Sequence, residues 1–390
     1  MQYRFIDSIK HVDKNAWNAL WPSTYPFTKF EFLHALELSG STTEKSGWQP
    51  SHLIAYEGES LVFAMPMYLK THSYGEYVFD WAWADAYARN GLDYYPKLLS
   101  AIPFTPATGP RWAVADKTLL NFQEVNAYIV EHAKAMKASS FHCLFPDAES
   151  KQLFVGTDLI ERNGCQFHWF NRNYRDFDDY LSHFSSRKRK NIRKERQKTA
   201  EFNIEIASAA ERETKDWEWF YQLYHRTYLK RSGRPGYLGA DFFLELANTL
   251  ADQLLLASAS YNGENIAGAV YFKDDDCLYG RYWGSSLEVD ALHFETCYYR
   301  GIDYAIEYQL QRFDPGAQGE HKIQRGFQAV KTCSYHWVEN AAFRTAIDRF
   351  CAQEREHNEH YLRDARSYLP FKEGFIPVDE AILLNAAQTK

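Results

Sequence analysis

The feature that most constrains the fold is a hairpin pattern that occurs twice in the chain. Residues 52–70 read HLIAYEGESLVFAMPMYLK, and residues 254–273 read LLLASASYNGENIAGAVYFK. Each places a tyrosine before x-Gly-Glu, at Tyr56 and Tyr261, with apolar strand-like runs on both sides. Glycine at that point supplies the positive φ that a tight turn needs. Both segments are therefore predicted to be β-hairpins.

The elements around the two hairpins follow the same order. Helical patterns precede each hairpin, and a third strand, a long amphipathic helix and a short strand follow it. In the first half these are residues 15–21, 30–38, 74–83, 120–137 and 140–146; in the second half they are 218–230, 241–250, 277–284, 292–310 and 311–315. The order predicts two copies of one α/β plan, with largely antiparallel sheets flanked by helices.

A length of 390 residues leaves room for two domains of common size. We expect a first domain over 1–165 and a second over 166–337 that includes a basic helix. Residues 160–176 are interpreted as the link between them. The helical pattern after Trp337 predicts a C-terminal segment, 338–390, that packs on the first domain.

Composition limits the function classes. Apolar residues make up 45% and charged residues 24%, which is ordinary for a globular protein. The start, MQYRFIDSIK, has no apolar core of a signal peptide, and no window approaches eighteen apolar residues. The six cysteines are scattered without a C-x-x-C motif, which favours reduced thiols. We expect a cytoplasmic protein without a membrane span. We also expect no metal site, because His357 and His360 alone make a poor ligand set.

Residues 183–198, HFSSRKRKNIRKERQK, concentrate positive charge in a chain whose formal net charge is -7. Eight of the twelve residues 187–198 are Lys or Arg, and one is acidic. The run predicts a helix with Ser185 or Ser186 as its N-cap and little to bury, so an outside partner would have to neutralise it. We interpret Arg187, Lys190 and Arg193 as contacts for a phosphate-bearing ligand. A solvated helix face or an incidental nucleic-acid patch remains the alternative.

The segment 313–322, FDPGAQGEHK, concentrates chemically active side chains at the end of a predicted strand. Amine attack on an ester or thioester needs a base for the ammonium proton and a donor for the oxyanion. Glu320 or His321 is the candidate base and Lys322 the oxyanion partner, with Asp314 nearby. The alternative is a polar turn whose charges satisfy the backbone.

The segment RYWGSS, 281–286, distantly matches the phosphate loop of acetyl-coenzyme A-dependent transferases, R/Q-x-x-G-x-G/A. Arg281, Gly284 and Ser286 would then bind a pyrophosphate at a helix start. The alternative is a helix entry in which the glycine serves packing.

Two segments of the first half suggest an acceptor site. PFTPATGPR, 103–111, offers Thr108 and Arg111 for a phosphate or carboxylate, although a plain turn fits as well. DWAWADAY, 80–87, brings Trp83 and Asp85 together, which suits a sugar or an amine; buried strand aromatics are the alternative.

Several long stretches resemble the FemAB-like predicted N-acyltransferases, a branch of the GNAT superfamily related to the Fem peptidyl transferases. They are DWAWADAY, PFTPATGPR, HCLFPDAE, FHWFNRNY, SSRKRKNIRKER, FDPGAQGEHKIQRGF and SYHW. The resemblance implies two tandem GNAT-like domains. Fem enzymes carry a lysine in the basic motif before Gly-Phe; here that register falls on Gln324, with Lys322 and Arg325 beside it.

The resemblance implies transfer of an acyl or aminoacyl group to a primary amine, in peptidoglycan-precursor or related metabolism, without a required cofactor. Aminoacyl-tRNA and acyl-CoA are the candidate donors. The expected partners are an anionic small molecule or tRNA as co-substrate and an amine as acceptor. An acetyl-CoA-dependent acetyltransferase is one alternative. A non-catalytic protein that binds precursors or nucleic acid is another.

Overall fold

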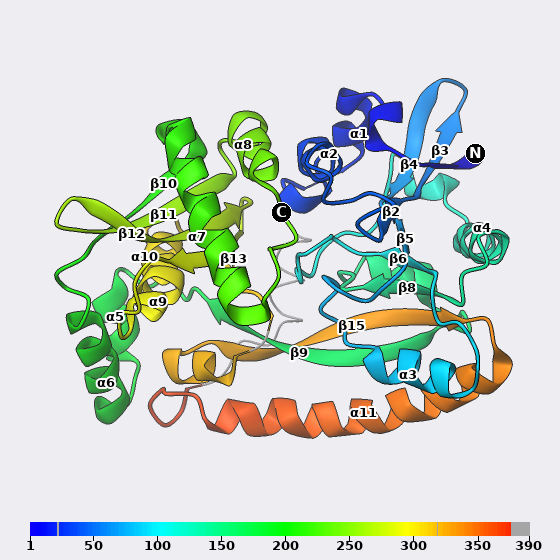
Figure 1. The fold of residues 1–390 in the computed structure, drawn as a ribbon. Helices are drawn as coiled ribbons and strands as arrows, with labels where there is room; N and C mark the ends of the chain where they lie inside the picture. Colours follow the sequence, from blue (N-terminus) through cyan, green and yellow to red (C-terminus); the bar gives the residue numbers. More distant parts are fainter. Residues whose placement is uncertain (22, 318, 376–390) are drawn as a thin grey trace. The chain divides into compact units, whose positions relative to one another are not determined.

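The computed structural model describes residues 1–21, 23–317 and 319–375, and the chain divides into two compact units (Figure 1). Unit 1 comprises Met1–Gly164 and Lys331–Glu359, and unit 2 comprises Cys165–Val330 and the chain from His360 onward. The chain therefore passes from unit 1 to unit 2, back to unit 1 and again to unit 2.

Unit 2 is built on a sheet of strand order β10-β11-β12-β13-β14-β9, antiparallel except where β13 runs parallel to β14. The strands are β10 (Asn203–Ser208), β11 (Leu254–Tyr261), β12 (Glu264–Lys273), β13 (Cys277–Ser285), β14 (Arg312–Asp314) and β9 (Ile160–Phe170). The predicted hairpin joins β11 to β12, with Gly263 at φ +83° in its turn. The predicted third strand is β13.

Helices cover this sheet in the predicted order. They are α5 (Phe177–Ser182), α6 (Ser186–Gln197), α7 (Thr214–Ser232), α8 (Ala240–Thr249), α9 (Leu292–Phe294), the π-helical turn η6 (Glu295–Tyr299), α10 (Arg300–Glu307) and the short 3₁₀ segment η7 (Glu320–Arg325). Asp176 caps α5 by accepting a hydrogen bond from the Asp179 amide. The largest core side chains are aromatic, including Trp169, Tyr180 and Phe313.

Unit 1 repeats the plan. One sheet has the order β1-β3-β4-β7, and β15-β8-β6-β5-β2 follow one another as neighbouring strands, with β6 parallel to β8. The strands are β1 (Gln2–Ile6), β2 (Trp48–Pro50), β3 (His52–Glu57), β4 (Ser60–Met65), β5 (Tyr68–Lys70), β6 (Lys97–Ser100), β7 (Ala113–Val114), β8 (Ser140–Leu144) and β15 (Gln328–Val338). The helices are α1 (Lys14–Leu20), α2 (Phe30–Leu38), α3 (Trp81–Arg89), α4 (Phe122–Ala135) and the first part of α11 (Ala341–Ser367).

One prediction about the first half was wrong. Residues 74–83 do not form a strand: Gly75 and Tyr77 have positive φ, and α3 begins at Trp81. The aromatic residues of this segment follow helical spacing, because Trp83 and Tyr87 are both buried on one face of α3. The strand that corresponds to β13 is β6, which pairs with β8 as β13 pairs with β14. The segment 160–170 forms strand β9, and the boundary between the two units falls within it, between Gly164 and Cys165.

Across the part of the chain that the structure describes, no helix has the length and apolar character to cross a bilayer. All six cysteines are free.

Candidate functional site

The basic run forms helix α6, preceded by Ser185 as N-cap, with Ile192 as its buried residue. Three of the four cations in its C-terminal half, Arg193, Arg196 and Lys198, pair with carboxylates of unit 2. Arg196 lies 2.9 Å from Glu295 and 2.6 Å from Asp303. Arg193 pairs with Asp178 at 2.8 Å and Lys198 with Asp290 at 2.5 Å, and both pairs are exposed. The expectation that an outside partner must neutralise this helix is therefore wrong for these three residues.

The first half of α6 is different. Arg187 and Lys190 are exposed and have no ion pair among the described residues. Of the predicted phosphate contacts, these two keep a free charge and Arg193 does not.

The acidic residue of the run, Glu195, connects α6 to η7. Its carboxylate lies 2.8 Å from the guanidinium of Arg325, and the hydroxyl of Tyr299 donates to the same oxygen. Arg325 also donates to the backbone carbonyl of His321 at 2.7 Å and lies over the ring of Phe294 at 3.5 Å. Arg325 thus holds the candidate catalytic segment by its backbone and is itself buried.

Two of the four predicted catalytic residues are buried. Burial opposes ionisation of Asp314, but Arg281 at 2.9 Å outweighs it, so the pKa of Asp314 lies well below its usual range. His168 lies 3.6 Å from the same carboxylate, and burial lowers the pKa of His168 to about 3. Burial also lowers the pKa of Lys322 to about 8, and its ammonium donates to the carbonyl of Gly316 at 2.8 Å. Asp314 and Lys322 therefore hold the shape of the loop.

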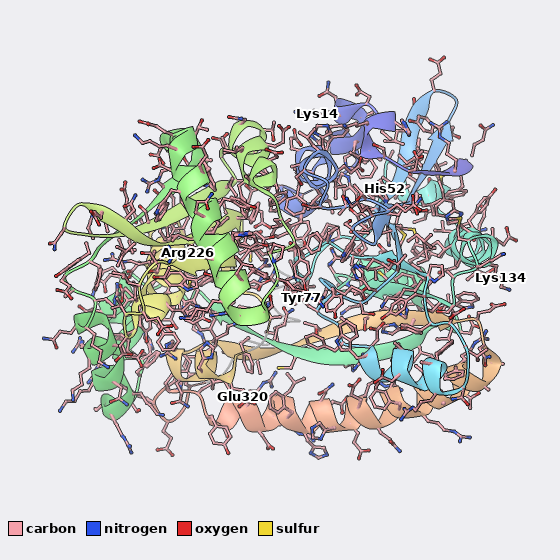
Figure 2. All side chains as sticks on the ribbon, viewed as in Figure 1. Lys14, His52, Tyr77, Lys134, Arg226 and Glu320 are labelled. Carbon is pink, nitrogen blue, oxygen red and sulfur yellow. The ribbon has the colours of Figure 1, made fainter. Side chains whose placement is uncertain are left out.

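The other two predicted catalytic residues are exposed. Glu320 is labelled in Figure 2. Its carboxylate accepts a hydrogen bond from the hydroxyl of Tyr361 at 2.7 Å. A ring nitrogen of His321, Nε2, lies 3.0 Å from the hydroxyl of Tyr298. Partial burial lowers the pKa of His321, which keeps a neutral imidazole available as a proton acceptor.

The segment RYWGSS lies mostly within strand β13 rather than in a loop before a helix. Arg281 is buried in its pair with Asp314. A Cβ at Gly284 would lie 2.5 Å from the backbone of Leu223 on α7, so glycine allows the strand to pack against this helix. The Ser286 amide donates to the carbonyl of Ile266 at 2.8 Å. This geometry favours the packing interpretation of the segment.

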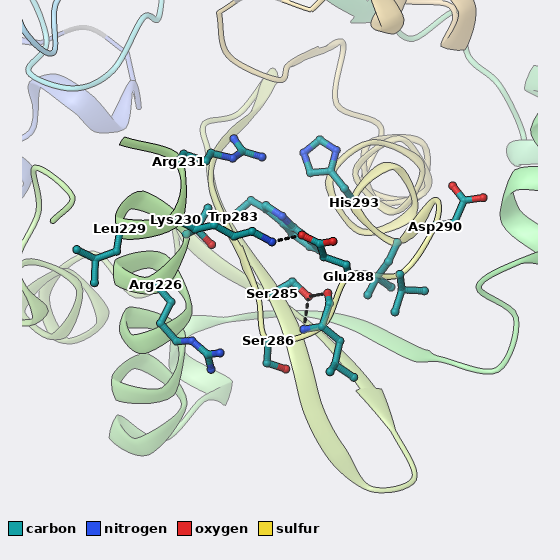
Figure 3. A pocket seen from close by; sticks show the side chains of 14 residues that line it. Arg226, Leu229, Lys230, Arg231, Trp283, Ser285, Ser286, Glu288, Asp290 and His293 are labelled. Atoms are coloured by element: carbon teal, nitrogen blue, oxygen red, sulfur yellow. Dashed lines mark hydrogen bonds and ion pairs between the residues drawn. The ribbon is translucent and has the colours of Figure 1, made fainter. Parts of the chain in front are cut away.

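A hollow of about 770 Å³ lies beside this segment, between the end of α7 and the connection from β13 to α9 (Figure 3). Arg226, Lys230 and Arg231 line it from α7. Lys230 reaches Glu288, whereas Arg226 and Arg231 have no ion pair among the described residues. Ser286 belongs to its wall. We call this feature the α7–β13 hollow.

His293 connects the hollow to the catalytic segment. It lines the hollow, and its ring lies 5.3 Å from Trp283 and 5.3 Å from Tyr298, which contacts His321. Burial lowers the pKa of His293 to about 4, so the imidazole is neutral at physiological pH. Sequence reasoning missed His293 and the α7 cations. The available signal was RTYLKR, 226–231, where three cations fall within six residues of a helix end.

The predicted acceptor residues lie in unit 1. Arg111 is 1% exposed and donates to the carbonyls of Ala107, Gly109, Pro110 and Leu144 at 2.6–3.1 Å. Four of its five N–H groups are thus occupied, and Arg111 serves the backbone of its own loop. Thr108 is partly buried in that loop. Trp83 is buried on α3 and Asp85 is exposed, so they do not form a joint site.

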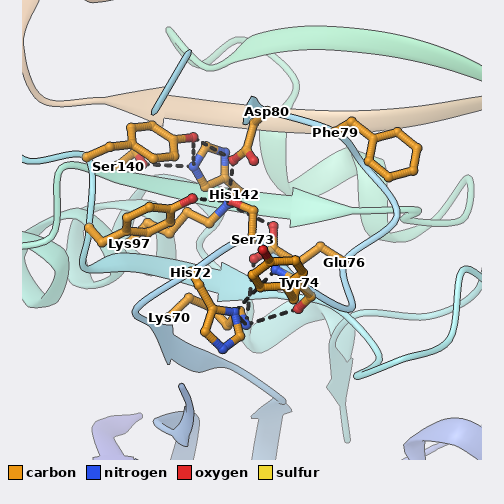
Figure 4. Close-up of polar contacts among 12 residues, drawn as sticks. Lys70, His72, Ser73, Tyr74, Glu76, Phe79, Asp80, Lys97, Ser140 and His142 are labelled. Atoms are coloured by element: carbon orange, nitrogen blue, oxygen red, sulfur yellow. Dashed lines mark hydrogen bonds and ion pairs between the residues drawn. The ribbon is translucent and has the colours of Figure 1, made fainter. Parts of the chain in front are cut away.

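Unit 1 also contains a buried ionic cluster next to Trp83 (Figure 4). Lys97, fully buried, lies 2.8 Å from Glu76 and contacts Asp80. Tyr94 donates to Asp80 at 2.6 Å, and His142 lies 3.3 Å from the Tyr94 hydroxyl. Burial raises the pKa of Glu76 to about 7 and lowers that of His142 to about 3. No cluster of described residues in either unit has the composition of a metal site.

The two units share one plan, that of tandem GNAT-like domains, in which a hairpin and third strand precede a helix and a parallel strand. The family model of FemAB-like proteins, described as peptidoglycan biosynthesis/recognition, matches residues 8–373. The chain belongs to this family, and the predicted fold class and family are confirmed. The family and the fold indicate a transferase.

Solved structures agree on the fold. The crystal structure of FemX is 12% identical with a TM-score of 0.51, covering 89% of this chain and 100% of its own. The C-terminal domain of a putative lysylphosphatidylglycerol synthetase from Agrobacterium fabrum is 11% identical in sequence with a TM-score of 0.51. The match covers 89% of this chain and 97% of that domain. A Bacteroides thetaiotaomicron protein of unknown function is 11% identical in sequence with a TM-score of 0.51, and the match covers 87% of this chain and 100% of that protein. A comparison with curated protein sequences found no match.

Proposed function

We propose that this chain is an N-acyltransferase that moves an acyl or aminoacyl group from an anionic donor to a primary amine. The observation that carries the proposal is the α7–β13 hollow, in which two unpaired arginines, Arg226 and Arg231, face a space connected to His321 through His293 and Tyr298. Guanidinium groups without protein partners suit phosphate oxygens.

In this proposal the phosphate-bearing part of the donor occupies the hollow and the acyl carbonyl lies toward His321. His321 accepts a proton from the attacking ammonium, so that the amine nitrogen can form a bond to the carbonyl carbon. The donor's alcohol or thiol then leaves as the tetrahedral intermediate collapses. Arg325 positions His321 through its backbone carbonyl.

Between the candidate donors, the distribution of charge favours aminoacyl-tRNA over acyl-CoA. Unpaired cations occur in the hollow and on the first half of α6, and Lys198 at the end of α6 pairs with Asp290 on the rim of the hollow. A long polyanion could use both groups, whereas a coenzyme would use the hollow alone. We place the reaction in the cytoplasm and its acceptor among peptidoglycan precursors, in keeping with the family description.

The test is a thermal-shift and calorimetric panel of acetyl-CoA, charged and uncharged tRNA, and UDP-linked peptidoglycan precursors, at low and moderate salt. A ligand that binds the native state raises Tm. We expect a salt-sensitive shift with tRNA that is lost in the double variant Arg226→Gln/Arg231→Gln and kept in Arg193→Gln, whose charge is already paired.

A Tm shift with acetyl-CoA alone, lost in the same double variant, would make acyl-CoA the donor in place of aminoacyl-tRNA. Binding without product in an assay with charged tRNA and an amine would favour the non-catalytic alternative. Binding that survives the double variant would refute the assignment of the hollow.

A further inference from the structure

A second pocket, of about 350 Å³, lies within unit 1 and is independent of the proposed transferase site. Strand β1, strand β2 with the residue after it, strand β5 and helix α4 contribute its walls. Half of the lining residues are apolar: Phe5, Ile6, Pro50, Leu69 and Met136. The other half are polar: Asp7, His11, Gln49, Ser51 and His132.

Two of those polar groups form a hydroxyl–imidazole pair. The hydroxyl oxygen of Ser51 lies 2.9 Å from Nε2 of His132, and both residues line the pocket. They are 81 positions apart in the sequence, so the fold rather than local chain geometry brings them together.

Both members of the pair are held in place. The imidazole of His132 stacks on Phe5 with ring centroids 3.5 Å apart and an angle of 7° between the planes. The Ser51 amide donates to the carbonyl of Met67 at 2.8 Å, which fixes the backbone that carries the hydroxyl. A rigid pair loses little entropy on reaction.

The protonation state of His132 suits a proton acceptor. Burial lowers the pKa of His132, so its imidazole is neutral at physiological pH and can accept the Ser51 proton. Charged neighbours do not oppose this, because Asp7 and His11 on the rim pair with each other at 3.2 Å and are exposed.

Gln49 is the candidate donor for a developing oxyanion. Gln49 lines the pocket two residues before Ser51, and positions i and i+2 of an extended segment face the same side. Its side-chain amide has no hydrogen-bond partner among the described residues, so its N–H groups remain available.

We propose that Ser51 is a nucleophile, with His132 as its base, that accepts short apolar acyl groups from activated esters. The Ser51 oxygen forms a bond to the acyl carbon as His132 Nε2 takes the hydroxyl proton. The bond from the acyl carbon to the leaving oxygen then breaks, and His132 returns the proton to that oxygen. Water, activated by the same imidazole, attacks the acyl-serine in turn; the acid leaves and Ser51 regains its proton.

The size and lining of the pocket set the substrate class. A volume of 350 Å³ walled by Phe5, Leu69 and Met136 fits a short acyl chain and excludes a bulky polyanion. This class differs from the donor proposed for unit 2, and loss of one site should leave the other intact.

The test uses the full chain and two probes, a biotin-linked fluorophosphonate and p-nitrophenyl butyrate. We expect one label per chain, located on Ser51 by peptide mass spectrometry, and butyrate release. Ser51→Ala should abolish both, and His132→Gln should slow labelling by about 100-fold or more, the usual range for a lost general base. Ser60→Ala, at an exposed serine of the same unit, is the matched control.

Circular dichroism and Tm establish that the variants are folded, and the tRNA thermal shift of Ser51→Ala should equal that of the parent. Labelling elsewhere than Ser51, or a rate that is the same in His132→Gln, would overturn the proposal. Failure of the unit 2 assignment would leave this result untouched, because the probes read Ser51 directly.

Discussion

The guanidinium of Arg325 lies 2.8 Å from the carboxylate of Glu195, the single acid of the basic run 187–198. The same guanidinium holds the backbone carbonyl of His321 at 2.7 Å. The acid in the run therefore has a structural explanation: it connects the basic helix to the segment that carries the candidate base. Arg325 therefore links the Glu195 carboxylate on α6 to the backbone position of His321.

Replacing Arg325 with Met should destabilise unit 2 by about 2–3 kcal/mol, because it leaves Glu195 and the His321 carbonyl without their donor. Urea unfolding monitored by tryptophan fluorescence measures the change. Arg193→Met, which removes another ion pair of helix α6, is the matched control. Its pair with Asp178 is 58% and 75% exposed, so we expect a change of about 0.5 kcal/mol or less. Equal effects of the two variants would contradict the role assigned to Arg325.

Gly284→Ala should destabilise the protein by about 2–4 kcal/mol whether or not a ligand is present. The added Cβ would meet the backbone of Leu223 at 2.5 Å, and backbone cannot move aside as a side chain can. Gly280→Ala in the same strand is the control, because its nearest neighbour is the ring of Phe313 at 3.3 Å. If Gly284→Ala folded normally and lost only ligand binding, the phosphate-loop interpretation of 281–286 would regain support.

The sequence predicted the hairpins, the basic helix and most helices, because local signals such as Gly58, Gly263 and the 3.6-residue periodicity determine them. It mispredicted residues 74–83, where aromatic residues fit a strand as well as a helix. Tertiary packing decided that choice.

The candidate site was less predictable, since charge in a sequence does not reveal its partners. Arg111 and Arg196 look like free cations until the structure shows their carbonyl and carboxylate partners. His293, by contrast, has no local motif, and becomes a site residue through contacts with Trp283 and Tyr298 that the fold creates.

Replacing Lys97 with Met should destabilise the protein by about 3–5 kcal/mol, because Asp80 would stay buried without the cation that contacts it and Glu76 would be left with the more distant Lys70, at 3.8 Å. Lys134→Met serves as the control, since its side chain is 54% exposed and lies 3.8 Å from Glu339. Chemical denaturation at pH 7.5 measures both. A loss below about 1 kcal/mol in the Lys97 variant would show that the cluster is hydrated or rearranged in solution.

The buried histidines predict that stability falls as the pH drops below 6.5. Burial lowers the pKa of His142 and His168 to about 3 and that of His293 to about 4, whereas an imidazole in the unfolded chain titrates near 6.5. The unfolded chain then binds protons that the folded chain does not, and each group costs up to about 1.4 kcal/mol per pH unit down to its folded pKa. Glu76, with its pKa raised to about 7, acts in the opposite direction between pH 7 and 4.5, and burial also raises the pKa of Glu295 and of Asp274. His336 adds to the effect of the three histidines, because burial lowers its pKa well below the usual value.

We therefore expect the free energy of unfolding to decrease by about 2 kcal/mol or more between pH 6.5 and 5.5. Urea titrations at the two pH values measure it. His293→Gln should reduce this dependence by about 1 kcal/mol, since glutamine does not titrate. His357→Gln, at a histidine on the exposed face of α11, should leave it unchanged. A stability that stays constant or rises over this interval would mean that the folded protein accommodates protonated imidazoles at these positions.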